Sequence, residues 1–260
     1  MNRRNLLTAG LMAGLTGGMA IAPPAWPQSA EADIIVMLED LHPYSYRDTQ
    51  GAPAGYAVEI AHEMLRRAGL NGRFEITSWS RVLAKGRTVP GVLIPAIVRL
   101  PEREKEFYWV GTAARRQAML YRRRNRADIS VSSMQDIHRY RTAVVIGDAS
   151  EHEMLALGLT AERHLDRSAD YGIALRRFFS DRADLLVISK SLAPTVLKQY
   201  GYNIADLEPV LKLRESASSV ALSLGTEAAT RNKLQQAFDA MHRDGALAEL
   251  AARYPAITLD

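Results

Sequence analysis

Short apolar runs alternate with amphipathic segments along almost the whole chain, and this alternation constrains the fold more than any other feature of the sequence. In chain order it predicts a strand at 33–38, a helix at 57–68, a strand at 73–76, a short helix from Trp79 and a strand at 91–97. Gly69 follows the first helix and is expected to end it. Strands that alternate with helices in this way predict an α/β fold with a parallel sheet.

A second series of the same kind follows the first. In chain order it predicts a strand at 142–146, helices at 150–157 and 168–179, a strand at 184–188, a helix at 192–200, a strand at 219–224, and helices at 227–243 and 245–254. No residue-level repeat relates the two series, so they are alike in pattern only. The sequence therefore predicts two similar lobes.

The composition and the motifs exclude several classes of protein. Lys and Arg number 33 against 29 Asp and Glu, and this formal charge of +4 is too small to indicate a nucleic-acid partner. The absence of cysteine excludes disulfides, thiolate metal sites and thiol catalysis. Glu151, His152 and Glu153 are consecutive on a predicted helix and cannot converge on one ion, so we expect no metal site and no cofactor. The sequence also lacks the nucleophile elbow of hydrolases and the glycine-rich loops of nucleotide enzymes.

Residues 1–32 resemble a cleaved export signal. Arg3 and Arg4 precede an uncharged apolar stretch at 6–22, which Pro23 and Pro24 end. The paired arginines are also similar to those of twin-arginine signals, and the alternative to cleavage is a retained N-terminal anchor. We expect a mature protein that starts near residue 33 and resides in the periplasm.

Several short segments, in order along the chain, carry a resemblance to a known family. They are His42-Pro43-Tyr44-Ser45-Tyr46-Arg47-Asp48, Gly55-Tyr56-Ala57-Val58-Glu59, Trp79-Ser80-Arg81, Pro101-Glu102-Arg103-Glu104-Lys105-Glu106-Phe107, Gly147-Asp148-Ala149-Ser150 and Met241-His242-Arg243-Asp244-Gly245. Together they resemble the bacterial extracellular solute-binding proteins of family 3, the polar amino-acid group that serves ABC importers. The resemblance covers residues 33–255.

This resemblance implies a two-lobed clamshell, the type II periplasmic-binding-protein fold, with a mixed, mostly parallel sheet in each lobe. Lobe 1 is expected to comprise 33–115, lobe 2 to comprise 116–216, and 217–260 to return and complete lobe 1. The chain is expected to cross between the lobes near 112–118 and 214–219.

The implied function is that of a binding protein, not an enzyme. A monomer would capture a small carboxylate-bearing solute by lobe closure and present it to the membrane permease of an ABC importer. Two alternatives stay open, namely a dehydratase-like periplasmic enzyme and a ligand-sensing partner of a membrane receptor.

Arg103 occupies the family position that binds the ligand carboxylate, and the planar donors of a guanidinium match a carboxylate two to one. The alternative is a surface arginine that pairs with a neighbouring glutamate. Tyr44 and Trp79 are expected to form apolar walls of the site, with Tyr46 as a possible third, although all three could instead belong to the core. Arg81 is expected on a solvated helix face rather than in the cleft.

In the second series, Gly147, Ala149 and Ser150 lie where a strand gives way to a helix. Free backbone N–H groups at such a helix start suit an anion. Ser150 can alternatively serve as the N-cap of this helix, and the two roles are compatible.

Two positions depart from the family pattern for an amino-acid ligand. Val98 stands where a Ser or Thr usually helps to hold the ligand ammonium, and Ser189 stands where an Asp usually pairs with it. A buried ammonium without a counter-charge is costly. We therefore expect either a carboxylate without a free α-ammonium or an amino acid that is held in a different way. A register offset that brings Lys190 into the cleft would strengthen the preference for an anion.

A basic stretch flanks the first expected crossing. It consists of Arg115, Arg116, Arg122, Arg123, Arg124 and Arg126. Because the whole chain carries no large cationic excess, we interpret this stretch as solvated strand and loop charge rather than a polyanion site.

Overall fold

The computed structural model describes residues 34–259 of the 260-residue chain. The predicted export signal at 1–32 lies outside the described residues. Within 34–259, no helix has both the length and the apolar character needed to span a bilayer.

Eight strands of the described residues form one hydrogen-bonded sheet, in the order β4-β1-β5-β10-β6-β9-β7-β8. Their bounds are β1 (Ile34–Glu39), β4 (Gly72–Thr77), β5 (Val92–Val98), β6 (Phe107–Arg123), β7 (Thr142–Val145), β8 (Leu165–Ser168), β9 (Leu185–Ser189) and β10 (Leu207–Ser223). β1 is parallel to β4 and β5, and β7 is parallel to β8 and β9, whereas β10 and β6 are antiparallel to their neighbours. A separate ribbon pairs β2 (Tyr46–Arg47) with β3 (Pro53–Ala54).

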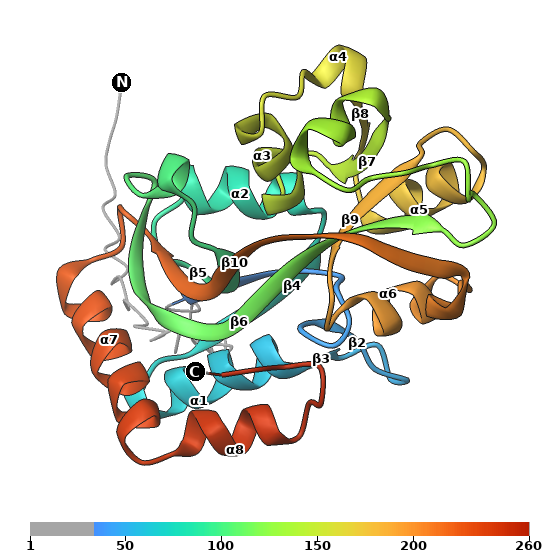
Figure 1. The fold of residues 1–260 in the computed structure, drawn as a ribbon. Coiled ribbons are helices and arrows are strands. Elements are labelled where there is room, and N and C mark those ends of the chain that lie inside the picture. The colour runs from blue at the N-terminus through green and yellow to red at the C-terminus, as the bar shows by residue number, and fades with distance from the viewer. Residues whose placement is uncertain (1–33, 260) are drawn as a thin grey trace, which may run out of the picture. The chain divides into compact units, whose positions relative to one another are not determined.

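The helices fall into two groups around this sheet (Figure 1). Lobe 1 contains β4, β1 and β5 with α1 (Tyr56–Ala68), α2 (Trp79–Thr88), α7 (Ala228–Arg243) and α8 (Ala246–Ala252). Lobe 2 contains β9, β7 and β8 with α3 (Ala149–Ala156), α4 (Ala161–His164), α5 (Tyr171–Phe179) and α6 (Ala193–Gln199). Three short 3-10 helices complete the fold, namely η1 (Pro101–Arg103), η2 (Met134–Arg139) and η3 (Ile204–Asp206). The prediction of a two-lobed α/β clamshell with mixed strands is confirmed.

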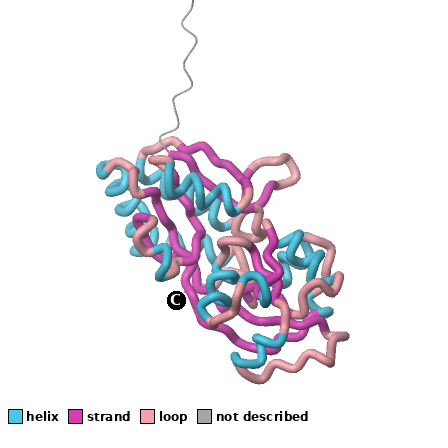
Figure 2. The backbone as a smooth tube through the Cα atoms, turned by 90° about the horizontal axis from the view of Figure 1, so that it is seen from above, coloured by secondary structure: helices cyan, strands magenta, loops and turns pink. Residues whose placement is uncertain are grey.

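β6 and β10 connect the two lobes. Each has 17 residues, and they pair with each other from Phe107 opposite Ser223 to Arg123 opposite Leu207. Figure 2 shows the strands continuing from the helices of one lobe to those of the other. The hydrogen-bonded sheet is therefore continuous, where the sequence led us to expect one sheet in each lobe.

Alternate burial along the strands explains how the helices cover both faces of the sheet. In lobe 1, Val36 of β1 belongs to the apolar cluster that includes α1 and α7, whereas its neighbour Met37 packs in the cluster of α2. In lobe 2, Leu186 of β9 packs with α5 and its neighbour Leu185 packs with α3. Because both faces are covered, these strands appear in the sequence as continuous apolar runs, which made them predictable.

Two predicted boundaries were wrong, and the strands β6 and β8 were not predicted. The predicted helix at 168–179 starts only at Tyr171, because residues 165–168 form β8. The last strand starts at residue 207 rather than 219, and β6 was not predicted as a strand at all. Both long strands carry charged side chains within their ladder, so neither shows an uninterrupted apolar run.

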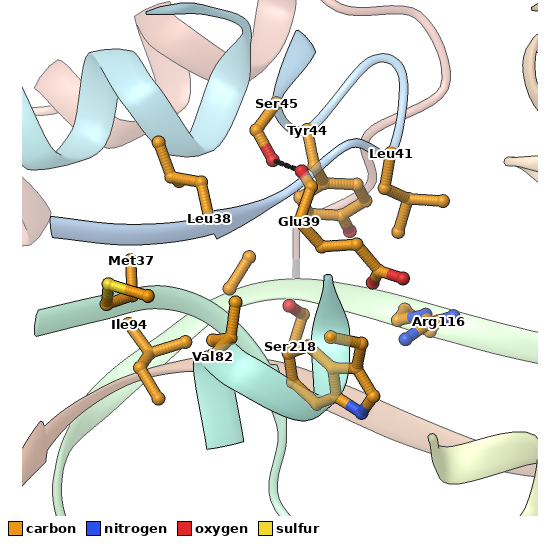
Figure 3. Close-up of a pocket in the computed structure, with 12 residues that line it drawn as sticks. Met37, Leu38, Glu39, Leu41, Tyr44, Ser45, Val82, Ile94, Arg116 and Ser218 are labelled. Carbon is orange, nitrogen blue, oxygen red and sulfur yellow. Dashed lines mark hydrogen bonds between the residues drawn. The ribbon is translucent and has the colours of Figure 1, made fainter. Parts of the chain in front are cut away.

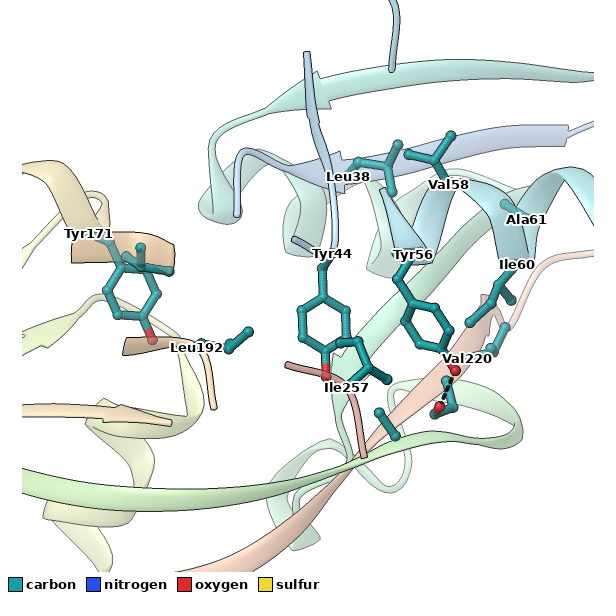
Figure 4. Close-up of a cluster of buried hydrophobic side chains, with 14 of the residues drawn as sticks. Leu38, Tyr44, Tyr56, Val58, Ile60, Ala61, Tyr171, Leu192, Val220 and Ile257 are labelled. Atoms are coloured by element: carbon teal, nitrogen blue, oxygen red, sulfur yellow. Dashed lines mark hydrogen bonds between the residues drawn. The ribbon is translucent and has the colours of Figure 1, made fainter. Parts of the chain in front are cut away.

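The segment between β1 and α1 fixes the position of Tyr44. Its ring meets the Tyr56 ring edge to face at 6.0 Å, and the Tyr56 hydroxyl donates to the backbone carbonyl of Ala113 at 2.6 Å (Figure 4). Gly55 has a φ of 116°, and a Cβ there would lie 2.6 Å from the Tyr44 carbonyl oxygen. Only glycine fits this close approach, which holds Tyr44 against the first turn of α1.

Candidate functional site

A cavity of about 30 Å³ lies where β1 ends, beside β5, α2 and the connecting strands β6 and β10 (Figure 3). It is lined by Met37, Leu38, Glu39, Leu41, Tyr44, Ser45, Trp79, Val82, Ile94, Ala96, Arg116 and Ser218. The walls are largely apolar, with a few polar groups gathered near Glu39. Such a lining is typical of small-molecule sites, but a cavity of this volume holds only about one water molecule, so a solute can enter only if the lobes separate.

Two of the predicted aromatic walls line this cavity. Trp79 is the first residue of α2, and Tyr44 stands in the loop after β1; both are nearly fully buried. The Trp79 indole nitrogen donates to the Gly147 carbonyl at 2.9 Å, so the ring is held from lobe 2 as well as from lobe 1.

Arg103 is buried between the lobes, with 1% of its surface exposed. Its Nη1 donates to the Val98 carbonyl at 2.9 Å, its Nη2 donates to the Gly147 carbonyl, and its Nε has no hydrogen-bond partner within the described residues. The guanidinium lies 5.6 Å from the centroid of the Trp79 ring, a cation–π distance. Burial lowers the pKa of Arg103, and the negative charge of Asp148 opposes this shift. The alternative of a surface arginine paired with a nearby glutamate is therefore wrong.

The carbonyl of Gly147 joins the two lobes, because Arg103 and Trp79 of lobe 1 both donate to it. Gly147 has a φ of 71°, and a Cβ there would meet the Leu83 side chain at 3.3 Å. The left-handed backbone conformation and the close approach of the Leu83 side chain both favour glycine at this position.

Protein groups already occupy most of the N-terminus of α3. Asp148 is its N-cap, with Oδ2 accepting from the Ser150 hydroxyl at 3.0 Å and from the Ser150 N–H at 3.4 Å, and the Ala149 backbone also hydrogen-bonds to this carboxylate. The Gly147 N–H donates to a Glu151 carboxylate oxygen at 2.7 Å. The alternative in which Ser150 is the N-cap was wrong, because the helix starts at Ala149 and Asp148, two positions before Ser150, accepts from the Ser150 N–H. The buried Asp148 carboxylate also lies where the sequence led us to expect an anionic ligand.

Asp148 is the counter-charge of two guanidinium groups. Burial alone would raise its pKa, but Arg116 and Arg103 outweigh burial, and the pKa is lowered. The Tyr171 hydroxyl also donates to Asp148, at 3.0 Å. This carboxylate is therefore ionised at neutral pH and stabilises the guanidinium groups of Arg103 and Arg116.

The other predicted site residues lie away from the cavity lining. The Tyr46 ring lies against the His42 ring, with centroids 4.4 Å apart and ring planes tilted by 33°. Val98 is buried and contributes only its carbonyl, while the buried Ser189 hydroxyl faces Ser191 at 3.3 Å. Lys190 is exposed and lines a different pocket, and Arg81 is exposed, as expected.

Sequence reasoning missed two charged groups of the cavity, Glu39 and Arg116. Figure 3 shows the Glu39 carboxylate pointing toward the Arg116 guanidinium. Burial, followed by the negative charge of Asp148, raises the pKa of Glu39 to about 8, although Arg116 opposes this shift. For Arg116, Asp148, Tyr171 and Tyr44 outweigh burial and raise the pKa.

The interpretation of Arg116 as solvated charge was wrong. Its position at the first expected crossing, opposite Ser216 of β10, was the available signal. Other members of the basic stretch form ion pairs within lobe 2, Arg122 with Glu208 at 3.0 Å and Arg126 with Asp128 at 2.8 Å. Residues 34–259 contain no group of three or more His, Asp or Glu side chains arranged to hold a metal ion.

Comparison with known proteins adds the following findings. The family model of bacterial extracellular solute-binding proteins, family 3, matches residues 34–256, whereas a search of curated proteins gives no significant match. A histidine kinase sensor domain with similarity to periplasmic binding proteins has a TM-score of 0.78 at 16% identity, over 87% of this chain and 97% of its own.

Two further solved structures have the same fold. An ABC uptake transporter substrate-binding protein from Streptococcus pneumoniae with bound histidine has a TM-score of 0.72 at 17% identity, over 87% of this chain and 94% of its own. An ancestral amino-acid-binding protein, a precursor of cyclohexadienyl dehydratase, has a TM-score of 0.69 at 18% identity, over 85% of this chain and 95% of its own.

Proposed function

Because this chain belongs to the bacterial extracellular solute-binding proteins, family 3, we propose that it captures a small carboxylate-bearing solute between its two lobes and presents the closed form to an ABC importer. It does so without chemical conversion of the solute. Ligand contacts made by both lobes favour the closed state, which is a shift of population.

The observation that carries this proposal is the buried guanidinium of Arg103 at the contact between the lobes. In the structure described here, one of its donors bonds to the Gly147 carbonyl of lobe 2 and Nε is without a partner. Once the lobes separate, a ligand carboxylate can replace the Gly147 oxygen and accept from two of these donors. Trp79 and Tyr44 then cover the apolar part of the solute.

The proposal also covers the export of the protein, its oligomeric state and its partner. Residues 1–32 direct export to the periplasm, and the mature chain acts as a monomer with lobe 1 at 33–115, lobe 2 at 116–216 and a return segment at 217–260. The partner is the importer permease. A membrane receptor is the alternative, in view of the similarity to a kinase sensor domain.

A thermal-shift screen of the mature protein tests this function. Carboxylates are expected among the hits, and a ligand at 100 times its Kd should add about 2.7 kcal/mol to the free energy of unfolding. Arg103→Ala is expected to weaken binding by about 10-fold or more, because each charge-assisted hydrogen bond contributes roughly 1.5–3 kcal/mol. Isothermal calorimetry then gives the affinities.

Arg99→Ala is the matched control. Arg99 is exposed, pairs with Glu104 and lies outside the cavity lining, so its loss should leave the affinity unchanged. Circular dichroism checks that both variants fold. A hit set confined to cations or neutral sugars would contradict the proposed function.

A dehydratase-like activity is the second candidate function, and Glu39 is the observation that favours it. A carboxylic acid whose pKa is raised to about 8 stays largely protonated at neutral pH and can donate a proton to a substrate in the cavity. Formation of a new product from a carboxylated ring compound, lost in Glu39→Gln, would establish an enzyme in place of a binding protein.

A further inference from the structure

Glu39 is the last residue of β1, and its side chain enters the cavity while its backbone is held in place. The Ser45 hydroxyl donates to the Glu39 backbone carbonyl at 2.6 Å. Within residues 34–259, by contrast, the Glu39 carboxylate makes neither a hydrogen bond nor an ion pair. An acid that is half-buried without a hydrogen-bond partner destabilises the folded chain, and such groups tend to occur at functional sites.

The charged groups that face Glu39 come from four elements. Arg116 of β6 is the cation, and it lowers the pKa of Glu39. Among the anions, Asp148 at the start of α3 raises this pKa most. Asp170, the N-cap of α5, and Asp40, the next residue in the chain, add further negative charge. Together with burial, these anions favour the protonated form of Glu39.

The cleft contains the buried guanidinium of Arg103 and the half-buried guanidinium of Arg116, and the Asp148 carboxylate interacts with both. A simple carboxylate ligand adds negative charge to the cleft, so Glu39 stays protonated. A ligand that also carries an ammonium places a cation beside Glu39, and this cation favours the ionised form of the acid. The two ligand classes thus differ in whether a proton leaves Glu39.

The positions that usually hold an ammonium offer no counter-charge here. Val98 is apolar, and the Ser189 hydroxyl faces Ser191 outside the cavity lining. We propose that Glu39 receives the ammonium of a solute whose carboxylate binds a guanidinium of the same cleft, and that Glu39 releases its proton to solvent as the solute binds. This inference rests on the proposed function and specifies how the charged ends of the solute are held.

Paired probes test the inference. Each L-amino acid is compared with its 2-deamino analogue, such as L-alanine with propionate, by thermal shift on the mature protein. The tightest-binding amino acid is then titrated calorimetrically at pH 7 in phosphate and in Tris, two buffers that differ in ionisation enthalpy. We expect about 0.9 proton released per ligand bound, because a group with a pKa near 8 is about nine-tenths protonated at this pH.

Glu39→Gln should abolish proton release and lower the affinity for the amino acid by about 10-fold or more. The affinity for the deamino analogue should change by less than about threefold. Glu249→Gln is the matched control, since Glu249 is exposed on α8 and lies outside this cavity. Equal binding of the deamino analogue, or unchanged proton release in Glu39→Gln, would overturn the inference but leave the proposed function standing. If no carboxylate binds the native protein, both fail.

Discussion

The Glu39 carboxyl group makes the stability of the ligand-free protein depend on pH. Its pKa rises from 4.5 to about 8 on folding. At pH values between these two, the unfolded chain has lost this proton and the folded chain keeps it. The free energy of unfolding therefore falls as pH rises through this window, the reverse of the trend for a carboxylate with a lowered pKa.

Glu39→Gln should remove this dependence, because an amide does not titrate. We expect the free energy of unfolding of the native protein, relative to Glu39→Gln, to fall by about 2–4 kcal/mol between pH 5 and pH 8. Urea denaturation across this range measures it. For the control Glu75→Gln, the free energy of unfolding should depend on pH in the same way as for the native protein. A hydrogen bond from Lys85 lowers the pKa of Glu75, so its titration lies below pH 5. If Glu39→Gln and the native protein showed the same pH dependence of the free energy of unfolding, the assigned protonation of Glu39 would be wrong.

Sequence alone could identify Arg103 as a candidate because a recognisable segment surrounds it. Arg116 has no such marker, since it shares its basic stretch with Arg122 and Arg126, which form ion pairs inside lobe 2. Only the pairing of β6 with strands from both lobes places Arg116 beside the cavity. Likewise, a glutamate at the end of a buried strand gives no sign of whether it meets solvent or a cavity.

At the scale of elements, Gly55 links β3 to α1 and keeps Tyr44 in the cavity wall. Gly55→Ala should lower the free energy of unfolding by about 1–3 kcal/mol or more, because the new Cβ would stand 2.6 Å from the Tyr44 carbonyl oxygen at a positive φ. Gly51→Ala is the control, since Gly51 also has a positive φ but no atom lies within 4 Å of its Cβ position. Equal losses in urea denaturation would show that the contact with Tyr44 is unimportant.

The elements differ in how far the sequence reveals them. Helix α1 and strand β5 each have one consistent apolar pattern, so they were predicted to within a few residues. β6 and β10 pair with each other along their length, and their stability comes from this long-range ladder rather than from local pattern. The sequence also failed to identify Asp148 as the N-cap of α3. Long-range contacts stabilise this side chain there, namely those with Tyr171 and with two arginines far away in the sequence.

At the scale of the whole described chain, α6 of lobe 2 contacts the segment after β1 of lobe 1. The Thr195 hydroxyl shares its one proton between the His42 carbonyl at 3.2 Å and the Leu192 carbonyl at 2.9 Å. The Gln199 amide donates to an Asp40 carboxylate oxygen at 3.1 Å. Together with the bonds to Gly147, these contacts hold the two lobes against each other. Such side-chain contacts between distant segments leave no pattern in the sequence.

A Thr195→Val, Gln199→Ala double variant should open the ligand-free protein. Each hydrogen bond contributes about 0.5–1.5 kcal/mol, so their joint loss favours the open state by roughly 1–3 kcal/mol. Small-angle X-ray scattering should show a larger radius of gyration, which returns to the native value when ligand is added. Lys198→Ala on the exposed side of the same helix is the control. An unchanged radius in the double variant would mean that other contacts hold the lobes together.

The place of β10 between β5 and β6 also affects how the protein is made. Its neighbours in the sheet are synthesised early, but the strand that joins them appears only after residue 207 has been added. Until then, a nascent chain on the ribosome lacks the strand that pairs with both β5 and β6, so the facing edges of these two strands are unpaired. The native sheet therefore cannot form during most of translation. Chaperones therefore have an extended period in which to engage the growing polypeptide.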